Sequence, residues 1–121
     1  MFENTQKGNA KKGLALLHPI GYNYFVIEIR KTDVFERWLT GLRDKRAVAK
    51  INTRLRRMML GNPGDVSPVR EGVSELRIDY GPGYRVYFVK RGNEVVILLA
   101  GGDKRTQAKD IEKALDLARI L

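Results

Sequence analysis

Two arginines lie inside strand-like runs, where a charged side chain is hard to place. Arg77 falls in VSELRIDY and Arg85 in YRVYFVK. A charged side chain on such a strand must face solvent or a ligand, because burying it without a partner is costly. The pattern therefore predicts a sheet that packs on one face and presents cations on the other. If Arg77 and Arg85 point to the same face, their two guanidinium groups could clamp one phosphate. Pairing of Arg77 with Glu75 or Asp79, which share its face by alternation, is the explanation without a ligand.

A second group of cations lies between residues 43 and 57, where seven side chains are basic and only Asp44 is acidic. Lys50, Arg54 and Arg57 are spaced i, i+4 and i+7, so in a helix they share a face, and like charges at that spacing repel one another. A bound anion would relieve the repulsion, although a solvated helix face shows the same pattern. We favour phosphate binding because the chain carries a net charge of +9, with 23 Lys and Arg against 14 Asp and Glu.

Two further positions lie near the strand ends. Tyr84 flanks the turn between the two arginine-bearing runs, where a tyrosine could stack on a base or pack in the core. The segment GGDKR (Gly101–Arg105) follows an apolar run, and its glycines allow close approach of the backbone. Lys104 and Arg105 lie at the end of this run, and a lysine or tyrosine that served as a base would need a lowered pKa. The same segment also fits a strand-to-helix loop with Asp103 or Thr106 as the helix cap, and the two interpretations are compatible.

Composition excludes several classes of site. The chain has no Cys and a single histidine, His18, so it offers neither a disulfide framework nor an ordinary zinc site. It has no P-loop, no GxGxxG before a helix, no GxSxG and no acidic cluster for a two-metal nuclease. We therefore expect neither a metal nor a cofactor. Metal-free cleavage is feasible on RNA, because the 2′-hydroxyl is an internal nucleophile and fixed cations can stabilise the charge that develops on the phosphoryl oxygens.

Apolar periodicity predicts one α/β (α+β) domain over residues 22–121. Strands are expected at Tyr24–Arg30, Val66–Val69, Val73–Tyr80, Tyr84–Lys90 and Glu94–Ala100. The last contains the continuous apolar run VVILLA and should be central, whereas Pro68 confines its strand to an edge. Helices are expected from Asp33, which forms a capping-box-like start with Glu36, from about Asp44 to Leu60, and over Thr106–Leu121. The result is a twisted, mainly antiparallel sheet with an N-terminal helical hairpin on one face and a C-terminal helix.

Residues 1–21 are expected to form a flexible N-terminal extension, because MFENTQKGNAKKG is polar and has no apolar period. The apolar part of LALLHPI is too short for a signal peptide and is interrupted by His18-Pro19. No run of eighteen apolar residues is present, so we expect no membrane partner.

Three segments carry a family signature: RKTDVFERWLTGLRD (Arg30–Asp44), GVSELRIDYGPGYRVYF (Gly72–Phe88) and LLAGGDKRTQAKDI (Leu98–Ile111). With these segments and the basic helix, the chain from about Tyr24 to Leu121 resembles the RelE/ParE toxin superfamily. The resemblance is closest to the HigB-like branch of addiction module killer proteins. It implies the toxin of a type II toxin–antitoxin system, located in the cytoplasm and neutralised by a small DNA-binding antitoxin of the helix-turn-helix type.

Two activities occur in that superfamily. HigB- and RelE-like members cleave mRNA, usually at the ribosomal A site, so the resemblance implies a metal-independent, ribosome-dependent mRNA endonuclease (mRNA interferase) acting on mRNA and the ribosome. ParE-like members instead inhibit DNA gyrase and are not nucleases, which is the alternative. The resemblance places Arg77 and Arg85 on the scissile phosphate, and Lys50, Arg54 and Arg57 on RNA backbone, with Tyr84 as a further RNA contact. The C-terminal functional position, often tyrosine or histidine in RelE-like enzymes, falls near Asp103-Lys104, which makes Lys104 the candidate acid or base.

Overall fold

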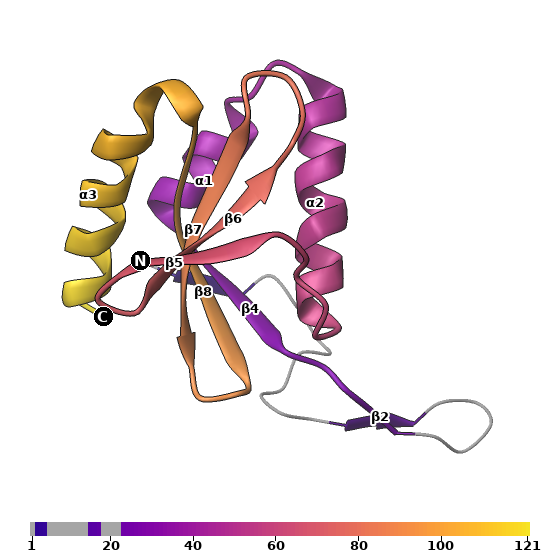
Figure 1. Ribbon diagram of the computed structural model, residues 1–121. Coiled ribbons are helices and arrows are strands. Elements are labelled where there is room, and N and C mark those ends of the chain that lie inside the picture. Colours follow the sequence, from indigo (N-terminus) through magenta and orange to yellow (C-terminus); the bar gives the residue numbers. More distant parts are fainter. Residues whose placement is uncertain (1, 5–14, 18–22) are drawn as a thin grey trace.

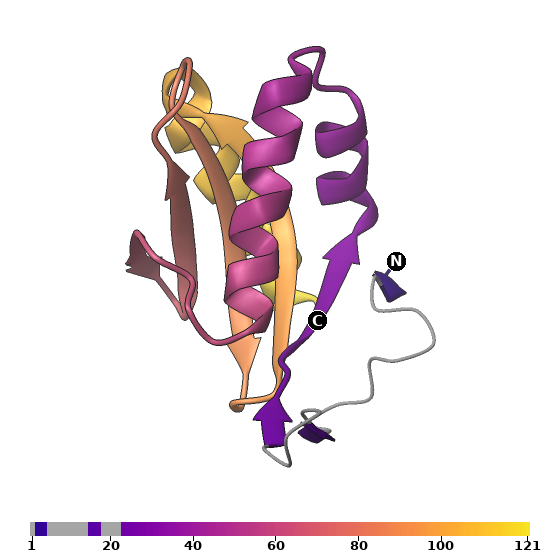
Figure 2. The same ribbon diagram turned by 90° about the vertical axis from the view of Figure 1, so that its right-hand side faces the viewer.

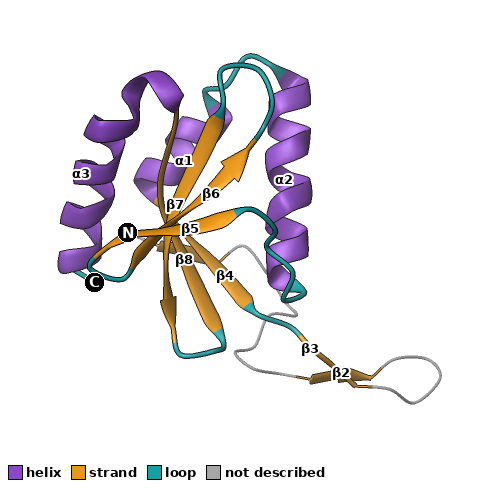
Figure 3. Ribbon diagram, in the orientation of Figure 1, coloured by secondary structure: helices purple, strands orange, loops and turns teal. Residues whose placement is uncertain are grey.

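The computed structural model describes residues 2–4, 15–17 and 23–121. Its elements follow one another as strands β1 (Phe2–Asn4), β2 (Ala15–Leu17), β3 (Asn23–Phe25) and β4 (Glu28–Thr32), helices α1 (Asp33–Thr40) and α2 (Lys45–Met59), strands β5 (Val66–Arg70), β6 (Val73–Ile78), β7 (Tyr84–Arg91) and β8 (Val95–Asp103), a 3-10 turn (Lys104–Thr106) and helix α3 (Gln107–Arg119) (Figures 1 and 3).

The main sheet has the strand order β1-β4-β8-β7-β6-β5 among the described residues, and only the β4–β8 pair is parallel. The short strands β2 and β3 pair separately. The mainly antiparallel α/β prediction is therefore confirmed. The apolar run VVILLA lies in β8, between β4 and β7, and all six of its residues are buried, as predicted for a central strand. Strand β5, which contains Pro68, is at the edge.

Helices cover both faces of this sheet (Figures 1 and 2). Helices α1 and α2 enclose one core against the sheet, formed by Phe35, Leu39, Ile51, Leu55, Leu76, Val86 and Leu98 among others. Helix α3 encloses a second core on the opposite face, which includes Val73, Tyr87, Val89, Leu99 and Leu115. The predicted sheet with one packed face and one open face is therefore wrong, because α3 covers part of the face that carries the cations.

Two boundaries at the start of the domain differ from prediction. The strand expected over Tyr24–Arg30 is divided between β3 and β4. Asp33 is not the cap of α1 but its first residue, and the cap is Thr32. The buried Thr32 hydroxyl accepts from the Phe35 amide at 3.1 Å and donates to the Leu99 carbonyl of β8 at 2.6 Å. Thr32 therefore caps the helix and ties it to the central strand.

The second helix begins and ends as predicted. The Asp44 side chain caps α2 by accepting from the amides of Arg46 and Ala47. The helix ends at Met59 with Leu60 as its C-cap, and Gly61 follows with a φ of 89°, a left-handed conformation that glycine adopts without strain.

Glycines near the end of β8 let side chains approach from both faces. A Cβ on Gly101 would overlap the Trp38 ring of α1, and a Cβ on Gly102 would overlap the Asp110 carboxylate of α3. The predicted close approach to this backbone is therefore made by the chain's own helices. The pair GG fixes how tightly α1 and α3 pack on β8.

The predicted flexible extension, residues 1–21, lies outside the described residues except for β1 and β2, and His18 is among those not described. None of the helices in the described part of the chain is both long and apolar enough to cross a membrane.

Candidate phosphate-binding site

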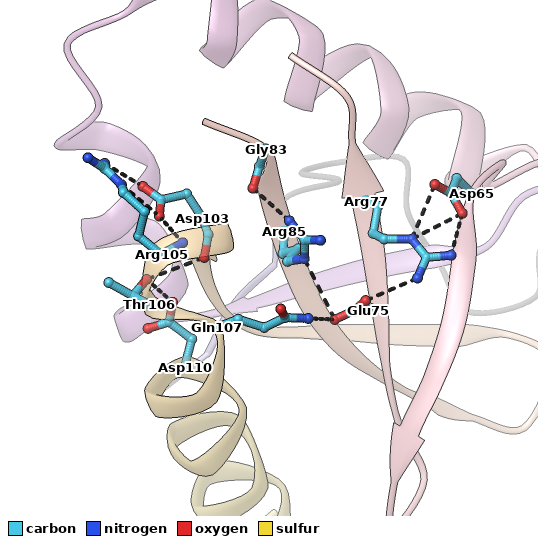
Figure 4. Close-up of polar contacts among 10 residues, drawn as sticks. All are labelled: Asp65, Glu75, Arg77, Gly83, Arg85, Asp103, Arg105, Thr106, Gln107 and Asp110. Atoms are coloured by element: carbon cyan, nitrogen blue, oxygen red, sulfur yellow. Dashed lines mark hydrogen bonds and ion pairs between the residues drawn. The ribbon is translucent and has the colours of Figure 1, made fainter. Parts of the chain in front are cut away.

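Arg77 of β6 and Arg85 of β7 are directly opposite each other in the strand register. Their neighbours Leu76, Ile78 and Val86 point into the α1–α2 core, so both arginines lie on the α3 face of the sheet. The two guanidinium groups are therefore on one face, as a phosphate clamp requires (Figure 4).

A buried carboxylate lies between these two like charges. Arginines directly opposite each other repel, which destabilises a sheet unless a counter-charge is near. Glu75, which is 6% exposed, supplies that charge. Its two oxygens lie 3.3 Å from Nη1 of Arg77 and 4.0 Å from Nε of Arg85, and the Gln107 side chain of α3 donates to it at 3.1 Å. Glu75 thus positions both arginines and is itself held by α3.

Arg77 has a second carboxylate partner at the outer edge of the site. Its Nε and Nη2 donate to the Asp65 carboxylate at 3.2 and 2.7 Å, a two-pronged contact at the protein surface. This hydrogen bond, and the charge of Asp65, raise the pKa of Arg77, and the same bond is the main cause that lowers the pKa of Asp65. In the described part of the chain the ion pairs of Arg77 are with Asp65 and Glu75, and not with Asp79.

Arg85 is more enclosed than Arg77. Its Nη1 donates to the Gly83 carbonyl at 2.9 Å, which directs the guanidinium toward the β6–β7 turn. Its Nε and the hydroxyl of Tyr87, the next residue of β7 on the same face, are buried and have no hydrogen-bond partner among the described residues. Burial raises the pKa of Tyr87, and the charges of Glu75 and Asp110 raise it further. Tyr87 is therefore a buried, neutral phenol on the same face of the sheet as Arg85.

The cations of α2 form a separate surface. Lys50, Arg54 and Arg57 share a groove of about 450 Å³ with Ile78 and Asp79, which confirms that they lie on one helix face. Because α2 packs against the face opposite to the arginine pair, the two cationic groups are on different sides of the sheet. Within the described residues the two groups meet at the end of β6, where Nη1 of Arg54 donates to the Arg77 carbonyl at 2.6 Å.

Arg54 has a structural role within this groove. Besides the Arg77 carbonyl, its guanidinium donates to the Pro63 carbonyl at 2.9 Å and so anchors the turn after α2. We expect Arg54→Ala to destabilise the fold by about 1–3 kcal/mol, since two carbonyls lose their donor. Arg57→Ala removes the same charge from an exposed position one turn along and should cost less than about 0.5 kcal/mol. Urea unfolding of both variants compares them, and equal stabilities would contradict the anchoring role.

Tyr84 does not present a ring for stacking on a base. It is 8% exposed and belongs to the α1–α2 core, where it meets Trp38 at a ring distance of 6.2 Å in an edge-on arrangement. The register places Tyr84 opposite Ile78, on the face away from the arginines. The predicted RNA contact by Tyr84 is therefore replaced by a packing role.

Lys104 lies on the rim of the site. It begins the 3-10 turn after β8, is exposed, and its Cβ lies close to Gly83, the residue whose carbonyl binds Arg85. The neighbouring Arg105 is occupied by the Asp103 carboxylate at 2.8 Å, and Asp103 caps the 3-10 turn. Thr106, the other predicted cap, is the N-cap residue of α3, without a capping hydrogen bond from its side chain. Lys104 thus lies beside the turn whose carbonyl binds Arg85, and its acid or base role stays a prediction.

Asp110 of α3 lies half-buried beside Gly102, and burial is the main cause that raises its carboxyl pKa. The hydroxyl of Thr106 donates to it and lowers the pKa, whereas the charge of Asp103 raises it. Because the folded pKa is above the unfolded one, this group's contribution to stability is present below the unfolded pKa and is lost as the pH rises through the folded pKa.

We therefore expect Asp110→Asn to be more stable than the unmodified chain at neutral pH, with a difference that shrinks in acid. Thermal unfolding of both chains, measured from neutral pH down into acid, tests the expectation. Asp116→Asn, on the exposed side of the same helix, is the control for the loss of one negative charge from α3. A lower stability of Asp110→Asn at neutral pH would contradict the assignment of burial as the dominant cause.

Comparison with known proteins identifies the family. Residues 37–121 match the family described as Phage derived protein Gp49-like (DUF891). The chain belongs to the Gp49-like family. This is a toxin-like family of type II toxin–antitoxin systems, related to RelE and HigB. A relative from Haemophilus influenzae (strain ATCC 51907 / DSM 11121 / KW20 / Rd), described as an uncharacterized protein, is 52% identical over 95 residues, which are 78% of this chain and 96% of the relative.

The Gp49-like match includes α2, β5 to β8 and α3, and so contains every side chain of the arginine site. The sequence predicts Arg77 and Arg85 as site residues and Glu75 as a possible partner of Arg77, but it does not predict the contacts of Asp65 and Gln107. No local pattern indicates them: Asp65 ends a turn twelve residues before Arg77, and Gln107 reaches Glu75 from α3 across thirty-two residues.

Proposed function

We propose that this chain is the toxin of a type II toxin–antitoxin pair and cleaves mRNA on the ribosome as a metal-independent endoribonuclease. Membership of the Gp49-like family implies an antitoxin partner, for which we propose a small helix-turn-helix protein. The observation that supports nuclease activity best is the arginine pair. Arg77 and Arg85 are opposed in register on one face and share one buried carboxylate, Glu75.

This arrangement suits cleavage by the RNA's own 2′-hydroxyl. That oxygen attacks the adjacent phosphorus, the bond to the 5′-oxygen breaks, and the products are a 2′,3′-cyclic phosphate and a 5′-hydroxyl. Arg77 and Arg85 would hold the scissile phosphate and stabilise the charge that develops on its oxygens. Lys104, on the rim, is the candidate acid or base. Lys50 and Arg57, exposed on α2, would hold RNA or ribosomal RNA backbone, while Arg54 keeps the groove in shape.

Induction of the chain in a bacterial host, with mRNA 5′ ends mapped within minutes, tests this function. We expect new ends inside translated codons, and their loss when translation is blocked before induction. Growth arrest with intact mRNA and a DNA-damage response would reject the nuclease and favour inhibition of DNA gyrase. That alternative needs no phosphate clamp, and the neutralisation of both arginines by carboxylates in the free chain agrees with it.

A further inference from the structure

The two carboxylates that bind Arg77 differ in how firmly they are held. Glu75 is buried, contacts both arginines and accepts from Gln107. The Asp65 side chain is 57% exposed and contacts Arg77 alone among the described side chains. Moving the Glu75 side chain would break its contacts with Arg77, Arg85 and Gln107. Rotating the Asp65 side chain would break only its ion pair with Arg77, which is at the surface. Such exposed pairs contribute little to stability.

The backbone at Asp65 stays in place without its carboxylate. The Asp65 carbonyl accepts from the Arg77 amide at 3.0 Å, and the preceding turn is anchored by the bonds from Arg54 to the Pro63 carbonyl. Exchange of the carboxylate for another anion therefore needs only a side-chain rotation. The outer edge of Arg77 is both preformed and accessible.

Cations from both groups converge at this position. Besides Arg77, the charges of Arg54 and Arg85 lower the pKa of Asp65. Asp65 thus lies where the fields of the two sheet arginines and of Arg54 from α2 overlap. A phosphodiester is an anion that accepts from a guanidinium in the same two-pronged geometry as a carboxylate.

We propose that the Asp65 carboxylate occupies the subsite for a substrate phosphate and leaves when RNA binds, while Glu75 stays and keeps the arginines in position. The proposal rests on the proposed function for its ligand, an RNA phosphodiester. Asp65 is then a competitor built into the chain, and it lowers the affinity of Arg77 for RNA until the phosphate displaces it.

The test uses the full-length chain and a fluorescent oligoribonucleotide with 2′-O-methyl groups, which cannot be cleaved because its nucleophile is blocked. Anisotropy at constant salt gives the Kd. We expect Asp65→Asn to tighten binding about two- to fivefold, the range for loss of one exposed ion pair. In the Arg77→Ala background the same substitution should change nothing, since the competition acts through Arg77.

The matched control is Glu71→Gln. Glu71 binds the exposed Arg119 in the same geometry, with Nε and Nη2 of Arg119 donating at 3.2 and 2.8 Å. The substitution removes the same charge as Asp65→Asn, but after the end of β5 rather than before its start. Its Kd should equal that of the unmodified chain. Unchanged or weaker binding by Asp65→Asn overturns the proposal, and so does equal tightening by Glu71→Gln, which would show an effect of overall charge.

Mapping of mRNA 5′ ends with Asp65→Asn separates this inference from the proposed function. Tighter oligonucleotide binding by Asp65→Asn, when neither this variant nor the unmodified chain cleaves mRNA, would support the subsite and reject the nuclease. Codon-located ends made by the unmodified chain and lost in Asp65→Asn would support the nuclease and overturn the inference, because Asp65 would then take part in the chemistry.

Discussion

Arg77→Ala is expected to abolish growth arrest by lowering the rate of mRNA cleavage about 10²–10³-fold, the usual loss when one donor to a developing oxyanion is removed. The fold should survive. The Arg77 side chain is 38% exposed, its partner Asp65 is at the surface, and Glu75 keeps Arg85 and Gln107 as partners. Growth curves and mapped mRNA ends measure the activity, and circular dichroism with thermal unfolding measures the fold.

Arg70→Ala is the matched control for this variant. Arg70 is an exposed arginine of the neighbouring strand β5 and pairs with Glu112 of α3, away from the arginine pair. It removes the same charge and should leave toxicity unchanged. A soluble, folded Arg77→Ala chain that arrests growth as fast as the Arg70→Ala chain would show that Arg77 does not hold the scissile phosphate.

Glu75→Ala should have the largest effect on stability, a loss of about 3 kcal/mol. It leaves Arg85, whose side chain is 13% exposed, without a carboxylate, and breaking a buried pair by removing one partner typically costs 3–5 kcal/mol. The Gln107 amide loses its acceptor as well. Such a loss is a large part of the stability of an ordinary domain. Urea unfolding gives the free energy directly.

Two companion variants separate the charge from the space it fills. Glu75→Gln keeps the volume and an acceptor oxygen for Gln107, so it should cost less than Glu75→Ala. In Glu75→Ala combined with Arg85→Ala the isolated buried cation is gone too, so the double variant should lose less than the sum of the single losses. Strict additivity, or a Glu75→Ala chain as stable as the unmodified one, would show that the carboxylate does not position the arginines.

The helices and strands of this fold could be predicted from the sequence because each is specified by residues within the element itself. The apolar stripe and the Asp44 cap define α2, and the run VVILLA marks the central strand. Strand alternation and the short turn between β6 and β7 also determine that Arg77 and Arg85 lie on the same face of the hairpin.

The errors arose where tertiary contacts decide. Thr32 outcompetes Asp33 as a cap because its hydroxyl also reaches β8, sixty-seven residues along the chain. Arg54 turns inward because the carbonyls of the 61–65 turn and of β6 converge on it. Tyr84 is buried because the helix above it, α1, carries Trp38. Periodicity contains no information on any of these partners.

The parallel pairing of β4 with β8 ties the beginning of the domain to its end. Strand β4 pairs with β8 in the centre of the sheet only after β8 has been synthesised, and contacts between such distant parts of the chain make folding slow. During synthesis α1 emerges well before β8, the strand on which it packs. A chain interrupted upstream of β8 lacks the central strand that contributes to both cores, so nonsense mutations anywhere before Val95 should be complete losses of function.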